Sequence, residues 1–320
     1  MELGKVNRIL KIYDKLINGE SINKKELANE FDVNIRTIQR DIEDIRNYLA
    51  NNYDMENIIY DYKNNVYYLE KNKQRTLTTI QIFSMIKILL ESRAFCKDEM
   101  KGIIDSIFSY VPKIESKEIK SLVLNELYHF QPLTHEKPIL KLIWDLGECI
   151  LKKEIIKIDF YKVSGEKGER TVYPLAVVFS EYYFYLVAKI KDSKYENPAF
   201  FRIDRIENFK KINKKYLMSR FEEGELKKRI MFMYGGELIK IKFRYTGTPI
   251  EHILDKFPTA KMTNIEENVH EFDVEVYGKG CIMWFLSQGE NIEIISPVDL
   301  REEVREKINK MIQIYNKGEY

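Results

Sequence analysis

The stretch that decides the fold of the first part of the chain runs from residue 34 to residue 42 and reads NIRTIQRDI. Isoleucines at positions 38, 42 and 45, followed by Leu49, recur every three or four residues, which is the spacing of one buried helix face. Asn34 stands directly before this pattern and is a residue type that caps helix N-termini. We therefore predict a helix that begins after Asn34 and packs its apolar face on a core.

The other face of the same helix carries side chains of the types that can hydrogen-bond to DNA. Arginine and glutamine donate to base edges in the major groove, and threonine contacts bases or phosphates. We predict that the start of the helix reads duplex DNA through five residues: Asn34, Arg36, Thr37, Gln39 and Arg40. A structural reading stays open for Arg40, since the acidic residues Asp41, Glu43 and Asp44 could pair with Arg40 or Arg46.

Outward from this helix, the patterns complete a small domain. Apolar residues between Val6 and Ile17 predict a first helix, and Asn23 with Glu26 is a capping pair for a second helix that ends near Phe31. Residues 58–69 are rich in Ile, Val and Tyr and are interrupted by Asn64-Asn65, which predicts a two-stranded hairpin. Residues 1–72 are thus predicted to form a winged helix-turn-helix.

The run from Asn34 to Ile42 also resembles the recognition helix of bacterial DeoR-like regulators, whose pattern is S-x-R-T-I-x-R-D-I. The resemblance implies a DNA-binding transcription regulator. A three-helix unit that serves only protein contacts is the alternative.

Residues 73–153 are predicted to be a helical linker. Thr78 or Thr79 can cap its first helix, and further helical patterns cover residues 103–110, 119–128 and 139–150. The apolar stripes of these helices fit a spacer with its own small core, a dimerisation surface, or both. His129 and His135 flank a turn in this region and are interpreted as loop histidines.

From Ile155 the period changes to strict alternation, which predicts an antiparallel sheet over residues 154–215. Strand-like segments start at residues 155, 170, 183 and 201. These segments, in this order and behind this type of domain, resemble the WYL domain of bacterial regulators. Phe184 stands where the family name has tryptophan (W). The resemblance implies a small Sm/SH3-like β-barrel.

The resemblance also implies a pocket that binds single-stranded DNA or a nucleotide-like anion. By position, the effector-binding residues are Arg170, Tyr185, Arg202 and Arg205. Guanidinium groups pair with phosphates, and an aromatic ring offers a face on which a base can stack. Ala199 stands where the family often has another arginine, and Asp204 is interpreted as structural, in a salt bridge with Arg205. Core packing is the structural alternative for Tyr183 and Phe184, and alternation along the strand supports it for one of the two.

Residues 216–320 read as strand, helix, strand, strand, helix and strand, followed by a terminal helix behind Ser296-Pro297. This order is typical of a ferredoxin-like sandwich. It resembles the C-terminal extension that accompanies WYL domains, and the exposed part of its last helix is a possible dimerisation surface. The predicted fold class is therefore multidomain α+β.

Composition narrows the function classes. The 52 basic and 50 acidic residues give a net charge of only +2, so a DNA contact must come from local placement. The three cysteines are far apart and without metal-ligand spacing. There is no Gly-x-Gly-x-x-Gly, Walker or nucleophile-elbow motif, and the Gly-Arg-Gly loop of biotin-ligase repressors, the nearest bifunctional alternative, is absent from the sequence.

We therefore expect no enzymatic activity, no cofactor and no metal. No apolar run approaches the ~18 residues needed to span a bilayer, so a cytoplasmic protein without a membrane partner is expected. The expected partners are double-stranded operator DNA, an effector that is single-stranded DNA or nucleotide-like, and a second copy of the chain in a homodimer.

Overall fold

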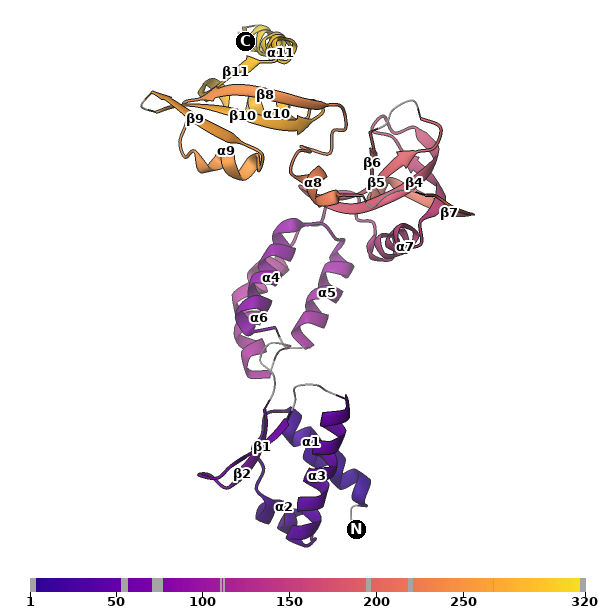
Figure 1. Ribbon diagram of the computed structural model, residues 1–320, viewed down its shortest axis with the longest axis vertical. Coiled ribbons are helices and arrows are strands. Elements are labelled where there is room, and N and C mark those ends of the chain that lie inside the picture. The colour runs from indigo at the N-terminus through magenta and orange to yellow at the C-terminus, as the bar shows by residue number, and fades with distance from the viewer. Residues whose placement is uncertain are drawn as a thin grey trace. The chain divides into compact units, whose positions relative to one another are not determined.

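The computed structural model describes residues 4–52, 57–70, 77–109, 111, 113–193, 197–217, 221–266 and 268–316 (Figure 1). The chain divides into two compact units, Met1–Ile82 and Phe83–Tyr320, which are taken in turn below. The predicted boundary between residues 72 and 73 lies outside the described residues.

The N-terminal unit contains three helices and a hairpin. They are α1 (Lys5–Ile17), α2 (Lys24–Glu30), α3 (Ile35–Asn52), β1 (Asn57–Asp61) and β2 (Val66–Glu70). Asn23 Oδ1 accepts from the Lys25 amide and Asn34 Oδ1 accepts from the Arg36 amide, so both predicted caps are present. Asn65 has a φ of 57°, the left-handed conformation that its residue type tolerates in a tight turn. The isoleucine stripe of α3 is buried, as the spacing predicts.

A buried ion pair joins α1 to α3. Arg8 Nε donates to Asp41 Oδ2 at 2.5 Å and Arg8 Nη2 donates to Asp41 Oδ1 at 3.2 Å, with the side chain of Asp41 only 1% exposed. Of the three acidic residues predicted as possible partners of Arg40 or Arg46, Asp41 is thus engaged by Arg8, and among the described residues the predicted pairing is seen only between Glu43 and Arg46. Arg46 also contacts the carbonyl of Ile58 in the hairpin.

The second unit begins with a helical segment made of α4 (Thr79–Ser92), α5 (Lys97–Ser109) and α6 (Lys113–Tyr128). The Thr78 hydroxyl accepts from the Gln81 amide while Gln81 Oε1 accepts from the Thr78 amide, which is a reciprocal cap at the start of α4. Helices α5 and α6 begin earlier than the apolar pattern predicts because their first turns are polar, and Tyr110 lies outside the described residues.

Helix α7 (Leu140–Leu151) packs against a five-stranded antiparallel sheet. The strands are β3 (Glu154–Tyr161), β4 (Lys167–Ser180), β5 (Tyr183–Ile190), β6 (Ala199–Arg202) and β7 (Ile206–Lys215), in the order β6-β5-β4-β3-β7. Within the described residues β6 and β7 are the two edges, so the predicted closed barrel is not seen. A 3₁₀ turn at Ile203–Arg205 also divides the strand predicted over 201–206.

The last part has a four-stranded antiparallel sheet in the order β11-β8-β10-β9. Its elements are α8 (Glu223–Lys227), β8 (Leu238–Tyr245), α9 (Glu251–Lys256), β9 (Lys261–Glu266), β10 (Val269–Tyr277), α10 (Cys281–Ser287), β11 (Ile292–Ser296) and α11 (Val298–Asn316). Phe243, Phe257, Phe272 and Phe285 form the centre of its core. Among the residues described for α11, only Leu300 is buried. Across the described helices, none is both long and apolar enough to cross a membrane.

The buried pair gives a stability prediction. Replacing Arg8 with Met leaves the Asp41 carboxylate buried without its partner, which we expect to lower the free energy of unfolding of the N-terminal unit by about 3–5 kcal/mol. Both tryptophans, Trp144 and Trp284, lie in the second unit, so the measurement is hydrogen exchange of α3 amides in the full chain.

The matched control is Lys5→Met, which breaks the Lys5–Asp44 pair between the same two helices. The side chains of Lys5 and Asp44 are 64% and 46% exposed, so the expected loss is under about 1 kcal/mol. Equal losses in the two variants would contradict a structural role for the buried pair.

Candidate nucleic-acid and effector sites

The start of α3 presents two arginines to solvent. Arg36 and Arg40 are exposed, and neither guanidinium group makes a hydrogen bond or ion pair with any residue that the structure describes. The structural alternative for Arg40, a pair with a neighbouring acidic residue, is not seen within that part of the chain. Both guanidinium groups are free to meet a phosphate or a base edge.

The other three residues predicted to contact DNA are engaged to different degrees. Asn34 caps the helix, and Thr37 is half-buried. Gln39 Oε1 accepts from Lys24 Nζ at 2.7 Å and from the Tyr67 hydroxyl at 3.2 Å. Gln39 therefore ties α3 to α2 and to the hairpin. Sequence periodicity could not show this, because both partners come from other elements.

A basic, aromatic cavity of about 500 Å³ lies on the five-stranded sheet. Three of the predicted effector residues, Tyr185, Arg202 and Arg205, line it. The fourth, Arg170, is not part of the lining, and its guanidinium donates to the Glu169 carbonyl. The sequence analysis missed Lys162, which lines the cavity after β3 and pairs with Glu166 at 2.9 Å.

Arg202 is held from two sides. Its Nε and Nη2 donate to the two carboxylate oxygens of Asp204 at 3.1 and 2.7 Å, and its guanidinium carbon lies 3.3 Å from the centre of the Tyr183 ring. The Asp204 side chain is 5% exposed. Asp204 is structural as predicted, but its partner is Arg202 and not Arg205. Tyr183, one of the two residues for which core packing is the alternative, is half-buried beneath a cation.

Arg205 and Tyr185 complete the polar wall of the cavity. Arg205 is half-buried and has no hydrogen bond or ion pair to another described residue. Burial raises the pKa of Tyr185, so its phenol stays protonated and can donate a hydrogen bond near neutral pH. A half-buried guanidinium without a carboxylate partner favours an anionic ligand.

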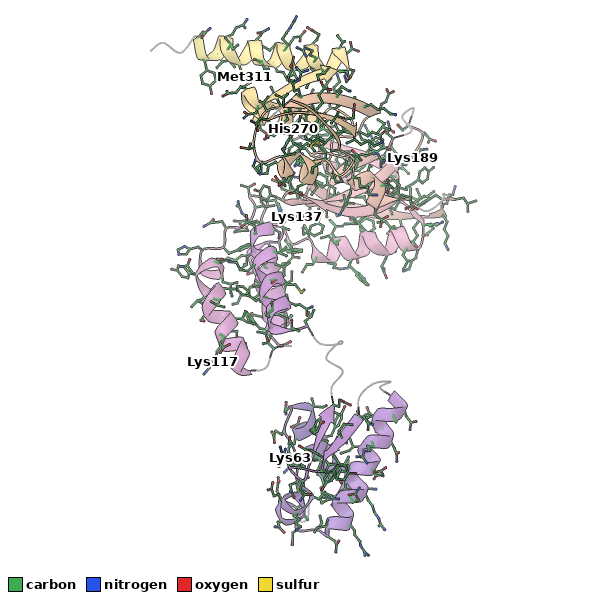
Figure 2. All side chains as sticks on the ribbon, turned by 60° about the vertical axis from the view of Figure 1, so that its left-hand side comes forward. Lys63, Lys117, Lys137, Lys189, His270 and Met311 are labelled. Carbon is green, nitrogen blue, oxygen red and sulfur yellow. The ribbon has the colours of Figure 1, made fainter. Side chains whose placement is uncertain are left out.

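The loop before α7 contacts the turn that joins β6 to β7. Lys137, labelled in Figure 2, donates from Nζ to the carbonyls of Asp204 and Ile206, and the His135 ring lies 6.5 Å from the Tyr183 ring. The chain entering α7 is fixed by Glu99 of α5, which accepts from the amides of Ile139 and Leu140. Phe95, which precedes α5, packs on Phe184. The helical segment is thus joined to the strands that carry Arg202.

Two protein-family models match the chain. A model described as an HTH domain covers residues 8–59, and a model described as a WYL domain covers residues 142–211. Each of the two domains that the sequence analysis expected is thus matched, and the predicted resemblance to helix-turn-helix regulators with a WYL domain is confirmed. Together the two domains indicate a DNA-binding regulator.

Among solved structures, the chain is similar to proteasome accessory factor B/C (PafBC) of Arthrobacter aurescens, with 14% identity and a TM-score of 0.32 over 94% of this chain. The chain spans 47% of that protein, about half its length. It is also similar to a CRISPR Cas-related protein, with 16% identity and a TM-score of 0.38 over 78% of this chain and 75% of that one. A comparison with curated proteins finds no match.

The surroundings of His135 give a pH prediction. Burial and the charges of Arg202 and Lys137 lower the pKa of His135, while Asp204 and Glu99 oppose the shift. We expect an NMR titration midpoint below the ordinary value of 6.5, with a still lower midpoint in Asp204→Asn, which removes an opposing negative charge.

The sign for stability follows from this direction. Neutral His135 contributes to the free energy of unfolding in full above pH 6.5, and this contribution is lost as the pH falls through the lower midpoint of the folded state. A midpoint at or above 6.5 would show that the loop does not bury His135 against the sheet.

Proposed function

We propose that the protein is a transcription regulator that binds duplex operator DNA through the start of α3. The observation that carries this proposal is the exposure of Arg36 and Arg40, two guanidinium groups that have no partner among the described residues, on a helix whose opposite face is buried. In helix-turn-helix proteins this helix end enters the major groove. The contact residues are Asn34, Arg36, Thr37, Gln39 and Arg40, with Gln39 also holding the helix in place.

The regulator responds to an anionic effector, single-stranded DNA or a nucleotide-like molecule, in the basic cavity. Arg205 offers a guanidinium that no described residue pairs, Arg202 offers a second one, and the Tyr185 ring gives a base a surface for stacking. Arg170 was predicted for this site by its position in the sequence, but the proposal leaves it out because it is not part of the cavity lining.

Ligand binding is coupled to the helical segment through Arg202. A phosphate competes with Asp204 for the guanidinium, and Asp204 and Tyr183 contact Lys137 and His135 of the loop before α7. A ligand shifts this equilibrium only as far as it binds one arrangement better than the other.

The division of the chain follows these roles. Residues 1–72 bind DNA, residues 73–153 connect, residues 154–215 sense the effector, and residues 216–320 form an extension for dimerisation. The homodimer is supported by α11, where Ile308, Met311, Ile312 and Tyr315 are exposed. Two copies read two half-sites about one helical turn apart on DNA.

The DNA proposal predicts a large effect of Arg36→Ala. We expect affinity for a duplex, selected from a random pool by the wild-type chain, to fall about 10- to 100-fold, since a good base contact is worth about 1–3 kcal/mol. If Arg36 contacts a phosphate instead, the slope of affinity against salt falls by about 1.

The control is Arg170→Ala, which removes an exposed arginine from β4 in the second unit and should leave duplex binding unchanged. Duplex binding with no dependence on salt would contradict a phosphate-contacting domain and favour a protein-interaction module.

The effector proposal predicts different effects for three arginines. We expect Arg202→Ala and Arg205→Ala to weaken binding of a short single-stranded oligonucleotide about 10- to 100-fold, because a hydrogen bond to a charged group contributes about 1.5–3 kcal/mol. Arg170→Ala is the matched control, since Arg170 is exposed and outside the cavity lining.

The measurement is fluorescence anisotropy, with duplex binding as the test of folding. Equal losses in Arg170→Ala and Arg205→Ala would contradict the cavity as the site. Oligonucleotide binding that is absent at every salt concentration would contradict single-stranded DNA as the effector and leave nucleotides and small anions as ligands of the cavity.

A further inference from the structure

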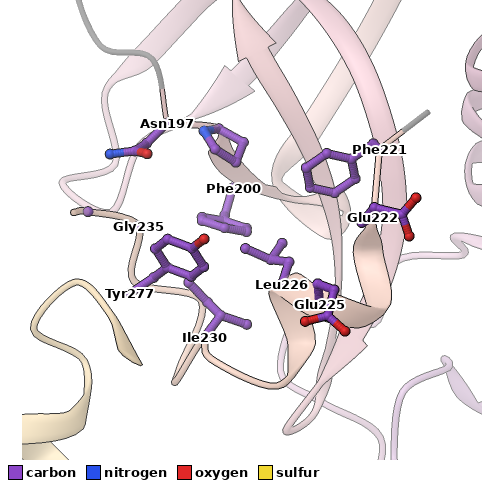
Figure 3. A pocket seen from close by; sticks show the side chains of 11 residues that line it. Asn197, Phe200, Phe221, Glu222, Glu225, Leu226, Ile230, Gly235 and Tyr277 are labelled. Atoms are coloured by element: carbon purple, nitrogen blue, oxygen red, sulfur yellow. The ribbon is translucent and has the colours of Figure 1, made fainter. Parts of the chain in front are cut away.

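A second cavity, of about 300 Å³, lies beside the basic one (Figure 3). It is bounded by β6 on the five-stranded sheet, by α8 and by the end of β10. Its walls are the rings of Phe200, Phe221 and Tyr277 with the side chains of Leu226 and Ile230. Three chain segments that are distant in sequence thus enclose one apolar space.

The two cavities lie along one face of the sheet. On β5 and β6, Tyr185 pairs with Arg202 and Val187 pairs with Phe200, so alternation places these four side chains on the same face. Phe200, together with Pro198 and Gly235, lines both cavities. The arginines stand at one end of this row and the aromatic space at the other.

The chemistry of the second cavity differs from that of the first. No lysine, arginine or histidine is among its described lining residues. Glu222 and Glu225 stand at one side, with their carboxyl groups turned away from Phe200 (Figure 3), and Glu225 is bound to Lys228 and Arg229. The described lining offers an anion no cation, which disfavours here the phosphate-bearing ligands expected in the basic cavity.

Two glycines keep the space open. A Cβ on Gly235 would lie 3.1 Å from the Phe200 ring and 3.2 Å from the Pro198 carbonyl oxygen, and one on Gly236 would lie 2.7 Å from the Cα of Gly278. The backbone of this segment therefore runs close to β6 and to the end of β10 without filling the gap between them. One polar group, the Tyr277 hydroxyl, has no hydrogen-bond partner among the described residues.

We propose that this cavity is a second ligand site, which binds a small, uncharged, planar aromatic molecule. The three rings offer stacking and edge contacts, the aliphatic side chains exclude water, and the Tyr277 hydroxyl supplies one hydrogen bond. The volume suits a molecule of one or two fused rings. This site is independent of the nucleic-acid ligand proposed for the basic cavity.

The test uses 5-fluoroindole as the probe and ¹⁹F NMR of the full chain as the measurement. We expect saturable binding with a dissociation constant of about 1 mM or tighter. Phe221→Ala, which removes one ring of the wall, should weaken binding about tenfold, and Tyr182→Ala, which removes an exposed ring outside the cavity, should not.

Two further arms separate the alternatives. Leu226→Phe adds bulk to the cavity and should also weaken binding, which keeps the test valid if Phe221→Ala fails to fold. Indole-3-acetate should compete at least about tenfold less well than indole, because its carboxylate finds no cation among the described lining residues. Tyr161→Ala, which removes an exposed ring from the lining of the basic cavity alone, should leave 5-fluoroindole binding unchanged.

The proposal is overturned if 5-fluoroindole does not saturate the chain. It is also overturned if Phe221→Ala, when folded, and Leu226→Phe both bind the probe as tightly as Tyr182→Ala, or if binding is lost in Tyr161→Ala. The last result would place the probe in the basic cavity.

Discussion

The proposed effector site depends on the contact between Arg202 and Asp204. A guanidinium on a half-buried strand is costly to hold without a partner, and the carboxylate of Asp204 supplies that partner through two hydrogen bonds. Because the backbone carbonyl of Asp204 also accepts from Lys137, the same residue connects the cavity to the loop before α7. One short turn thus contributes both to the cavity proposed to bind anions and to the contact with the loop before α7.

The N-terminal unit also depends on an arginine–carboxylate pair, but this pair holds two helices in a fixed arrangement. The Arg8–Asp41 pair is enclosed between α1 and α3, where no ligand can compete for it. Its role is to fix how the two helices cross, and with Lys24, Gln39 and Tyr67 it sets the orientation of the helix that carries Arg36. The Arg8–Asp41 pair therefore stabilises the packing of two helices, whereas the Arg202–Asp204 pair lies where a ligand can compete with Asp204 for the guanidinium.

The helices of the N-terminal unit could be predicted closely, because apolar residues at every third or fourth position are buried together only when the segment is helical. The Arg8–Asp41 pair could not, since ion pairing across 33 residues leaves no periodic signal. β7 was missed because its sequence, IENFKKINKK, is that of a charged edge strand in which only Ile206 is buried. The turn at Ile203–Arg205 was missed because alternating apolar residues continue through it.

The candidate sites show the same limit. The family resemblance implied four effector residues, and the structure brings three of them to one cavity. Arg170 lies apart because it is on β4, opposite Ile158 of β3, and its placement depends on strand register that no local pattern specifies. The aromatic cavity beside the basic one could not be predicted from a local sequence pattern, because its lining comes from β6, α8 and β10.

The central claim is that an anion at Arg202 changes how tightly the chain binds duplex DNA. The most direct measurement is duplex affinity, by anisotropy at fixed salt, with and without a saturating single-stranded oligonucleotide, for the wild type and for Arg202→Ala. The account predicts a change in duplex affinity of about 5-fold or more in the wild type that is lost in the variant. Duplex affinity that is the same with and without a bound oligonucleotide in the wild type would contradict it.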